Sequence, residues 1–189
     1  MVVSTELKIT PTEYLEREKT ATERTEFIDG QLFPMAGASA NHNQLTSKLT
    51  GFLTVGLDDE IFDVFVSDMR VWLQETESYV YPDLVVSKCP SVFIDDSQME
   101  LTNPCFIAEV LSPSTARYDK KAKFDLYKTI PTLEEYLILP QNQQKIELYR
   151  RLQQNQWLLT EFEIDDSPIM LESLNLEISL PKLYKKVIF

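Results

Sequence analysis

An almost wholly apolar run at residues 104–111, Pro-Cys-Phe-Ile-Ala-Glu-Val-Leu, contains a single charged residue, Glu109. Its length and its aromatic and β-branched residues predict a β-strand. Because side chains alternate along a strand, Glu109 is expected on the face of Cys105, Ile107 and Leu111. Both faces are otherwise apolar, which is typical of a sheet covered by helices on both sides. The pattern therefore predicts a sheet core that contains one carboxylate.

A second strand-like run, residues 79–86, contains Pro82 and Asp83 and is expected on a neighbouring strand. An unpaired charge in a sheet core is costly, so Asp83 and Glu109 must be protonated, paired with a cation or bound to a metal. Pro82 also fits an ordinary bulge or sheet edge. These two acids form the first candidate site in the chain.

A basic segment, residues 117–128, follows the acid-bearing strand. Ser114 or Thr115 is the expected N-cap of a helix there. At about 100° per residue, one stripe of this helix consists of Asp119, Lys123 and Tyr127. A lysine is therefore directed to one side, about one turn into a helix that leaves the strand of Glu109.

The remaining pattern predicts further helices and strands. Helices are expected at residues 12–19 and at 40–57, the second with the apolar stripe Leu45, Leu49, Phe52 and Leu53. Asp29-Gly30 marks a hairpin over residues 26–33. Strands are expected within residues 61–73, 135–139, 145–152 and 156–162, and a polar connection with one helical turn at 88–103. With no repeat and no sign of a second domain, we predict one α/β domain over residues 1–189, with a mixed central β-sheet flanked by helices.

Composition adds limits to this fold. The chain has 189 residues, 43% of them hydrophobic, which suits one sizeable core. No segment approaches the ~20 apolar residues of a membrane span, and the N-terminus lacks the order of a secretory signal. Cys89 and Cys105 are too few for a disulfide framework or a zinc cage and are expected to be inert. We expect a cytoplasmic protein with no membrane partner.

The net charge of −12 disfavours extensive binding to a polyanion. The excess lies in residues 1–116, with 7 basic and 19 acidic side chains, whereas residues 117–189 carry 11 of each. Residues 117–128 alone hold five basic and two acidic side chains. A local, metal-dependent contact with nucleic acid is therefore compatible with the charge.

Two carboxylates beside an ammonium suit one reaction in particular. Asp83 and Glu109 offer the oxygen ligands that hold Mg²⁺ or Mn²⁺. Such a metal generates a nucleophilic hydroxide and, with Lys123, offsets the charge that develops on a phosphate. The residues favour phosphodiester hydrolysis. The alternative for Lys123 is an ordinary solvated helix lysine.

An ordered set of short motifs accompanies these residues. It consists of Pro82-Asp83, Glu109-Val-Leu-Ser-Pro-Ser-Thr-Ala-Arg, Asp119, Lys123, Tyr127, Ile130-Pro-Thr-Leu-Glu-Glu-Tyr136 and, in the N-terminal half, Tyr14-Leu15, Thr25-Glu-Phe-Ile-Asp-Gly30, Met35, His42 and Arg70. This set resembles the Uma-type putative endonuclease family, bacterial proteins of the PD-(D/E)XK restriction-endonuclease-like superfamily. The resemblance covers roughly residues 10–150 and implies a restriction-endonuclease-like core.

The resemblance implies a Mg²⁺- or Mn²⁺-dependent endonuclease in which Asp83, Glu109 and the carbonyl of Val110 hold the metal. It implies nucleic acid, with DNA as the first expectation, as the partner, and we expect a homodimer. Glu26 resembles the extra acid that the superfamily places at the edge of its site, although an exposed glutamate at a strand end is also ordinary.

One position departs from the superfamily pattern. The usual lysine lies two residues after the second acid, and this chain has Leu111 there. The resemblance implies that Lys123 substitutes for it from the helix. Leu111 and the acidic charge also favour a rival, a catalytically silent nuclease fold that serves as an oligomeric or nucleic-acid-binding module. Glycoside hydrolysis by two carboxylates is a poorer fit, because it leaves Lys123 without a role.

Three further residues have two readings each. His42, the one histidine, either begins a helix or contacts a phosphate or shuttles a proton. Arg70 shares a predicted strand face with Asp68 and Trp72 and fits a structural ion pair as well as a phosphate contact. Tyr127 is expected to pack in the core rather than to act as a ligand.

Overall fold

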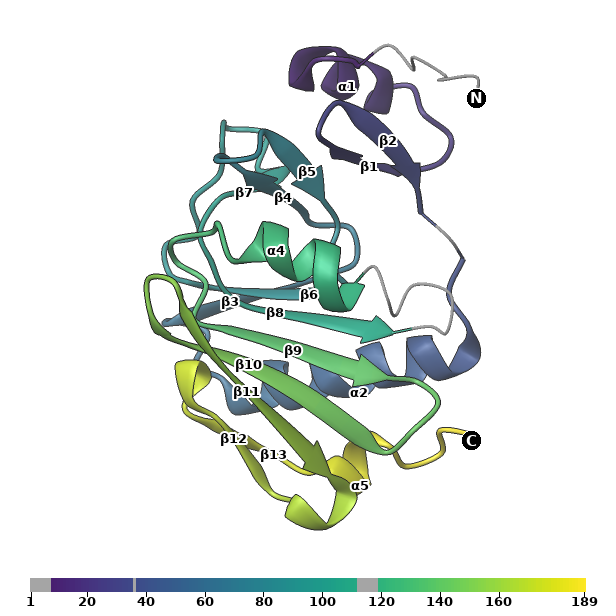
Figure 1. Cartoon of the computed structure of the whole chain (residues 1–189), viewed down its shortest axis with the longest axis vertical. Coiled ribbons are helices and arrows are strands. Elements are labelled where there is room, and N and C mark those ends of the chain that lie inside the picture. Colours follow the sequence, from purple (N-terminus) through teal and green to yellow (C-terminus); the bar gives the residue numbers. More distant parts are fainter. Residues whose placement is uncertain (1–7, 36, 112–118) are drawn as a thin grey trace.

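The computed structural model describes residues 8–35, 37–111 and 119–189 (Figure 1). The elements in chain order are α1 (Pro11–Glu18), β1 (Thr25–Ile28), β2 (Gln31–Pro34), α2 (Ala40–Gly56), β3 (Phe62–Val66), β4 (Arg70–Leu73), β5 (Ser78–Val80), β6 (Leu84–Lys88), β7 (Glu100–Leu101), β8 (Pro104–Leu111), the π-helix η1 (Asp119–Lys123), α4 (Phe124–Tyr127), β9 (Glu135–Pro140), β10 (Lys145–Gln153), β11 (Gln156–Glu163), the 3₁₀ turn η2 (Ile164–Asp166), β12 (Ile169–Leu171), the 3₁₀ turn η3 (Glu172–Leu174), β13 (Leu176–Ile178) and α5 (Leu180–Leu183).

A six-stranded sheet, in the order β11-β10-β9-β8-β6-β3, forms the centre of the molecule. Strand β8 runs antiparallel to β6 and parallel to β9, so the sheet is mixed. All eight residues of β8 are buried. The sequence prediction of a strand at 104–111 that is covered on both faces is confirmed.

Different elements cover the two faces of this sheet (Figure 1). Helix α2 packs its leucines against one face, together with β12, β13 and α5 from the C-terminal part of the chain. On the other face lie α4 and a second, five-stranded mixed sheet in the order β2-β1-β5-β4-β7. The α/β class is confirmed, but the single central sheet of the sequence prediction becomes two mixed sheets with few helices.

Local sequence signals explain several boundaries. At the turn of the β1–β2 hairpin, Asp29 and Gly30 both have positive φ, 50° and 80°, as a tight two-residue hairpin turn requires. Helix α1 begins one residue earlier than predicted, because Thr10 forms a capping box with Glu13. Helix α2 begins after Ser39, whose side chain accepts a hydrogen bond from the N–H of His42.

The prediction of one strand over residues 79–86 is wrong. The run is divided into β5 and β6, which lie in different sheets, and Tyr81, Pro82 and Asp83 connect them. Pro82 has no N–H to donate to a ladder, so a strand cannot continue through it in the middle of a sheet. Asp83 therefore lies at the entry to β6 rather than within a strand.

The alternation predicted for β8 holds with one exception. Ile107 and Leu111 pack in the cluster that contains α4, on the side of Glu109. Cys105 instead packs with Phe106 in the cluster that contains α2. The β6–β8 pairing shifts between Val86 and Ser87, and this irregularity moves Cys105 to the other face.

The helix predicted after β8 is described from Asp119 and consists of a π-helical turn followed by α4. The connection between β8 and this helix, residues 112–118, lies outside the described residues. It includes the predicted N-caps Ser114 and Thr115. The side chain of Asp119 is not described either.

Two further regions complete the comparison. The meander predicted after the basic helix is confirmed as β9, β10 and β11, whereas residues 88–103 contain the short strand β7 and no helical turn. Strands β12 and β13 and helix α5 were not predicted. Within the described ranges, no helix is both long enough and apolar enough to cross a membrane.

Candidate functional site

Glu109 lies near the end of β8 and is 4% exposed. Its position within the sheet follows from the apolar run that forms β8, which places seven neighbours in the core. Removing a carboxylate from water to this extent requires compensating partners. The structure supplies them from the helix that follows.

Lys123 and Tyr127 both bond to the same oxygen of Glu109. The distance from Lys123 Nζ to Glu109 Oε1 is 2.9 Å, and the Tyr127 hydroxyl donates to Glu109 Oε1 at 2.6 Å. The predicted stripe is thereby confirmed for these two residues. Burial, together with the charge of Glu109, raises the pKa of Tyr127 well above its usual value. The tyrosine therefore stays protonated and acts as the donor, so it is both a core residue and a partner of the acid.

Glu26 reaches the same ammonium from the second sheet. Its Oε1 lies 3.1 Å from Lys123 Nζ and accepts a hydrogen bond of 3.1 Å from the N–H of Tyr81. Glu26 and Lys123 are each 7% exposed, so the exposed strand-end reading of Glu26 is wrong. Lys123 thus connects an acid of β1 with an acid of β8, and the two sheets meet at this point.

Asp83 joins the site through the backbone of β8. Its Oδ2 accepts a hydrogen bond of 2.8 Å from the N–H of Val110, and its Oδ1 lies 3.0 Å from Nε2 of His42. The register pairs Leu84 with Ala108, so the next position places Asp83 beside Glu109. The two acids therefore stand at adjacent strand ends.

The carbonyl of Val110 faces the same side as its N–H. In a ladder, the N–H and C=O of one residue point to the same neighbouring strand. The carbonyl of Leu111 accepts from Gln141 N–H on the β9 side, at 3.1 Å, so that of Val110 points to the opposite side, toward Asp83. A backbone oxygen is thereby directed to the space between the two strand ends.

His42 both begins a helix and belongs to the site. It lies in the first turn of α2, where its backbone N–H is held by Ser39 while its ring meets Asp83. The side chains of His42 and Asp83 are 18% and 19% exposed, more than those of the buried acids. The solvent-facing edge of the site is therefore formed by this pair.

Arg70 does not join the site. Its Nη2 lies 2.5 Å from Oε1 of Glu100, and its guanidinium carbon lies 5.7 to 5.8 Å from the ring centres of Tyr14, Tyr79 and Tyr81. At 8% exposure it is a structural ion pair inside the second sheet. The phosphate-contact reading is not supported. Cys89 and Cys105 are free thiols.

The sequence analysis gave no role to two buried acids of the central sheet, Glu135 on β9 and Glu147 on β10. Glu147 on β10 pairs with Ile138, which in turn pairs with Glu109, so the two acids lie in one row two strands apart. Strand spacing puts them about 10 Å from each other. Glu147 is 4% exposed. Its signal in the sequence is a charged residue on the inward face of a predicted strand.

With this arrangement described, comparison with known proteins identifies the family. The sequence model described as "Uma2: Putative restriction endonuclease" matches residues 11–182. The chain belongs to the Uma2 family. The match extends beyond residues 10–150, and includes the C-terminal elements β12, β13 and part of α5.

Relatives of the Uma2 chain are similar over nearly its whole length. One uncharacterized protein of Synechocystis sp. is 48% identical, over 97% of this chain and 99% of its own. A second uncharacterized protein of the same organism is 32% identical, over 96% of this chain and 94% of its own. A solved structure, a putative nuclease belonging to DUF820 from Anabaena variabilis, aligns with a TM-score of 0.76 and 17% identity, covering 95% of this chain and 99% of that one. At that identity the likeness is one of fold.

The site does not contain a cage of metal-binding side chains. Across the described ranges, no three or more His, Cys, Asp and Glu side chains are grouped so that they could hold a metal ion. The oxygen groups that converge here are two carboxylates at adjacent strand ends and one backbone carbonyl. Any ion at this place must therefore complete its ligand shell with water or substrate.

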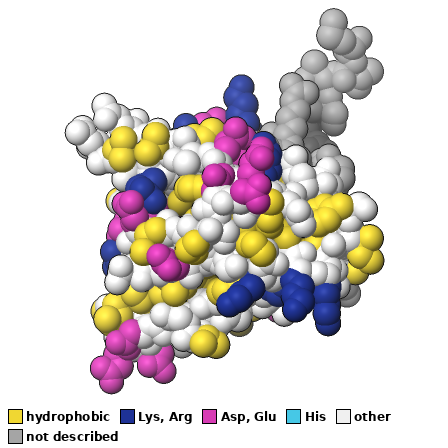
Figure 2. All heavy atoms as spheres, turned by 90° about the horizontal axis from the view of Figure 1, so that it is seen from below, with side chains coloured by type: hydrophobic (Ala, Val, Ile, Leu, Met, Phe, Trp, Pro, Cys, Tyr) yellow, Lys and Arg dark blue, Asp and Glu magenta, His cyan; other side chains and the backbone are white. Residues whose placement is uncertain are grey.

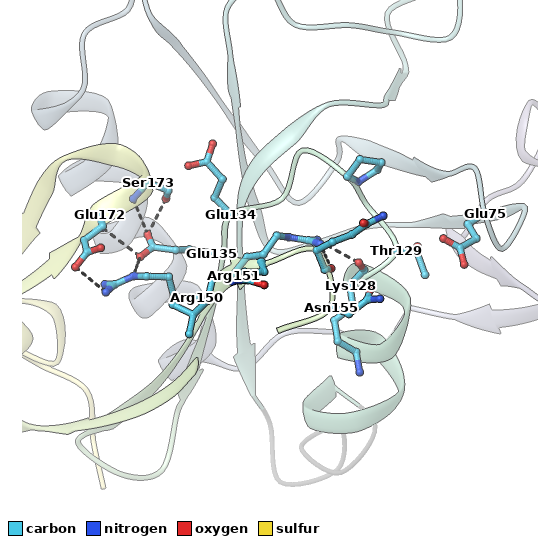
Figure 3. Close-up of a pocket in the computed structure, with 14 residues that line it drawn as sticks. Glu75, Lys128, Thr129, Glu134, Glu135, Arg150, Arg151, Asn155, Glu172 and Ser173 are labelled. Atoms are coloured by element: carbon cyan, nitrogen blue, oxygen red, sulfur yellow. Dashed lines mark hydrogen bonds and ion pairs between the residues drawn. The ribbon is translucent and has the colours of Figure 1, made fainter. Parts of the chain in front are cut away.

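A hollow of about 760 Å³ lies elsewhere, and Figure 3 shows its lining. None of Glu26, Asp83, Glu109 and Lys123 lines it. Three of its charged side chains form one network: Arg150 pairs with Glu135 and with Glu172. Arg150 Nε lies 2.8 Å from Oε1 of Glu135, whose Oε2 accepts from the Ser173 hydroxyl at 2.6 Å. These contacts join β9, β10 and η3. The hollow is therefore a structural junction.

Proposed function

We propose that the protein is a Mg²⁺- or Mn²⁺-dependent endonuclease that hydrolyses phosphodiester bonds of nucleic acid, with DNA as the first candidate, on a restriction-endonuclease-like core. One observation carries the proposal: Asp83, Glu109, Lys123 and Glu26, which are far apart in the sequence, converge from two sheets and a helix. The family description points the same way. The ammonium of Lys123 lies between two of the three acids.

The donor set suits a hard divalent cation. Asp83, Glu109 and the carbonyl of Val110 would hold the ion, since Mg²⁺ prefers oxygen ligands and usually takes only one or two carboxylates. When bound, the metal supplies Lewis-acid stabilisation of the phosphate and a water of lowered pKa. Two carboxylates without a histidine or cysteine ligand disfavour zinc.

The protein side chains then have distinct tasks. The bonds from Lys123 and Tyr127 hold Glu109 in one orientation on the side of its Oε1. Lys123 also places a positive charge beside the reacting phosphate, which favours a transition state with added negative charge. Glu26, fixed by the N–H of Tyr81, holds the ammonium of Lys123 from the opposite side. His42 lies at the exposed edge, where it orients Asp83.

The rival function is a silent nuclease fold that binds nucleic acid or a second copy of the chain. The specific observation in its favour is Leu111, which stands buried at the position of the usual lysine. In the rival, the bonds of Lys123 to Glu26 and Glu109 are a structural ion-pair network and nothing more. Cleavage measurements separate the two functions.

The test is to incubate the purified protein with supercoiled, linear and single-stranded DNA and with RNA, each with Mg²⁺, with Mn²⁺ and with EDTA. We expect metal-dependent cleavage that is lost in Asp83→Asn and Glu109→Gln. Asp63→Asn is a matched control, because Asp63 lies on β3 at the far edge of the same sheet and accepts a hydrogen bond from Ser91.

Calorimetric titration with each metal accompanies the cleavage assay. The wild type and Asp63→Asn are expected to bind the ion, and Asp83→Asn and Glu109→Gln to bind it weakly or not at all. Metal uptake without cleavage of any of the four substrates, or no uptake by the wild type, would refute the endonuclease and support the silent module.

A further inference from the structure

The β1–β2 hairpin carries exposed apolar side chains beside an acid of the candidate site. Its register places Phe33 of β2 directly opposite Glu26 of β1. Side chains that stand opposite each other lie on the same face of an antiparallel pair, with Cβ atoms about 4.5 to 5.5 Å apart. The aromatic ring of Phe33 is therefore the cross-strand neighbour of the acid that contacts Lys123.

The neighbours of the hairpin identify its two faces. Glu26 reaches Lys123 from one face, and Ile28, on the same face, packs against the cluster that contains α4. Phe27 packs on the other face, in a cluster with α1, and Leu32 stands opposite it there. The face of Phe33 is thus the face of the site, whereas the face of Leu32 is the face of α1.

Met35 continues the apolar row after Phe33. Its N–H donates to Arg24 O at 3.1 Å, so it extends the ladder by two positions on the same face, about 7 Å along the strand. Phe33 and Met35 are 37% and 40% exposed. Figure 2, which views the end of the molecule opposite to the hairpin, shows hydrophobic side chains scattered among charged ones, and such exposure is ordinary. What distinguishes the strip of Phe33 and Met35 is its place beside Glu26.

The charge of this region favours an uncharged contact. The acidic excess of the chain lies in residues 1–116, which include the hairpin. The cation on the same face, Arg24, is paired with Asp68. Further phosphate contacts on the hairpin are therefore disfavoured. The part of a nucleic acid that suits an exposed aromatic ring is the base, since every base has a π-face that can stack on it.

A second copy of the chain is a poorer occupant of the strip. Strand β2 is the last strand of its sheet, and such strands can pair with another chain. Because Met35 bonds to β1, Phe33 does so as well, and the N–H positions of Leu32 and Pro34 point outward. Pro34 has no N–H to donate. The outer edge of β2 is therefore poorly suited to strand pairing.

We propose that Phe33, with Met35 beside it, stacks on a base of the nucleotide next to the scissile phosphate, and that the substrate is nucleic acid whose bases are unpaired there. The proposal rests on the proposed function and names its substrate class. In a duplex each base is already stacked between its neighbours, whereas an unpaired base can be splayed onto an aromatic side chain. In an acidic chain, this contact adds affinity without added positive charge.

The test measures binding by fluorescence anisotropy in EDTA, over a series of KCl concentrations. The probes are short labelled single strands of DNA and of RNA, and the matching DNA duplex. A second set of single strands carries one abasic sugar, at each position in turn. The variants are Phe33→Leu, which removes the ring and keeps an apolar side chain, and Phe33→Trp, which enlarges the ring. Leu32→Ala is the matched control, because Leu32 is 36% exposed on the opposite face.

Stacking of one base on an aromatic side chain changes affinity by about 5- to 150-fold. We expect Phe33→Leu to weaken binding of the single strands by about 5-fold or more, with an unchanged slope of log K against log salt, since no charge is lost. Phe33→Trp should bind at least as tightly as the wild type, and Leu32→Ala should bind equally. Binding of the duplex should not depend on Phe33.

The abasic strands locate the contact without any variant. In the wild type, loss of one particular base should weaken binding by about the same factor as Phe33→Leu, and in Phe33→Leu that loss should have no further effect. Equal affinities in wild type and Phe33→Leu, the same abasic profile in both proteins, or a wild type that binds no single strand would overturn the contact. A wild-type dimer that Phe33→Leu converts to a monomer in sedimentation would also overturn it, because the occupant would then be a second copy.

The result is separable from that of the proposed function. Cleavage by the wild type together with unchanged binding by Phe33→Leu would remove the stacking contact alone. Binding of single strands that depends on Phe33, in a protein that cleaves none of the substrates, would keep the contact and remove the endonuclease.

Discussion

Replacing Lys123 by methionine tests the central contact of the site. Methionine keeps much of the length of the side chain and removes the ammonium. Two carboxylates, those of Glu26 and Glu109, then lie in the core without the charge that stands 3.1 Å and 2.9 Å from their Oε1 atoms. All three side chains are less than a tenth exposed, so water offers little compensation.

The magnitude follows from the cost of breaking a buried ion pair. Removing one partner of a buried ion pair typically lowers the free energy of unfolding by about 3 to 5 kcal/mol, and we expect a loss of that size here. For a chain of 150 to 250 residues, about 1 kcal/mol shifts the melting temperature by about 2 to 4 °C. We therefore expect Lys123→Met to melt about 6 to 20 °C below the wild type at pH 8.

The pH dependence gives the sign of the effect. In Lys123→Met, the folded protein relieves the repulsion between Glu26 and Glu109 by taking up a proton, which the unfolded chain does not need. Its stability therefore rises relative to the wild type as pH falls from 8 to 5. The double variant Lys123→Met/Glu26→Gln, which leaves one carboxylate, is expected to recover part of the loss at pH 8.

Differential scanning calorimetry of the three proteins at pH 8 and pH 5 provides the measurement. Lys121→Met is the matched control, since Lys121 is exposed on the same helix. A loss below about 1 kcal/mol for Lys123→Met, or a loss of equal size at both pH values, would refute the reasoning, because an exposed surface pair behaves in that way.

Three other outcomes are expected. Tyr127→Phe loses the buried hydrogen bond to Glu109, so urea denaturation at pH 7 should show a free energy of unfolding that is lower by about 1.5 to 3 kcal/mol. Because folding raises the pKa of Tyr127, the wild type should also lose stability as the pH rises above about 10, and the variant, which lacks the hydroxyl, should not lose it by this route. Arg70→Met should destabilise the protein and leave cleavage per folded molecule unchanged, and adding Glu100→Leu should restore stability; a selective loss of cleavage would reinstate the phosphate contact. Lys48→Met removes an ammonium whose Nζ is shielded from solvent and has no hydrogen-bond partner among the described residues, so its melting temperature should rise by about 2 to 4 °C at pH 7. Because burial lowers the pKa of Lys48, this gain should shrink as the pH rises and the wild type loses the proton, and a lower melting temperature for the variant would contradict this reasoning.

The part of the site that lies on continuous elements was predictable from the sequence. The apolar run around Glu109 specified a buried strand, and helical spacing specified that Lys123 and Tyr127 face one side. Both inferences depend only on the local geometry of one element. The structure confirms them in the two bonds to Glu109 Oε1.

The part that depends on contacts between elements was not predictable from the pattern. Glu26 enters the site because β1 pairs with β5 at Phe27 and Tyr79, a contact between distant segments. Asp83 was placed within one strand, since the hydrophobic pattern continues through Pro82, although the chain changes sheets there. Strands β12 and β13 have three residues each, too few for a period to be visible. The metal, the nucleic-acid partner and the homodimer stay predictions.

The bond between Lys123 and Glu26 has a mechanical consequence. Glu26 belongs to the β1–β2 hairpin, which Figure 1 shows at the edge of the molecule, whereas Glu109 belongs to the rigid centre. One ammonium therefore ties a peripheral hairpin to the sheet core. A ligand that moves this hairpin must lengthen or break the contact between Glu26 and Lys123. It thereby changes the electrostatic surroundings of Glu109 without contacting Glu109 itself. The position of the hairpin therefore influences Glu109 through Lys123.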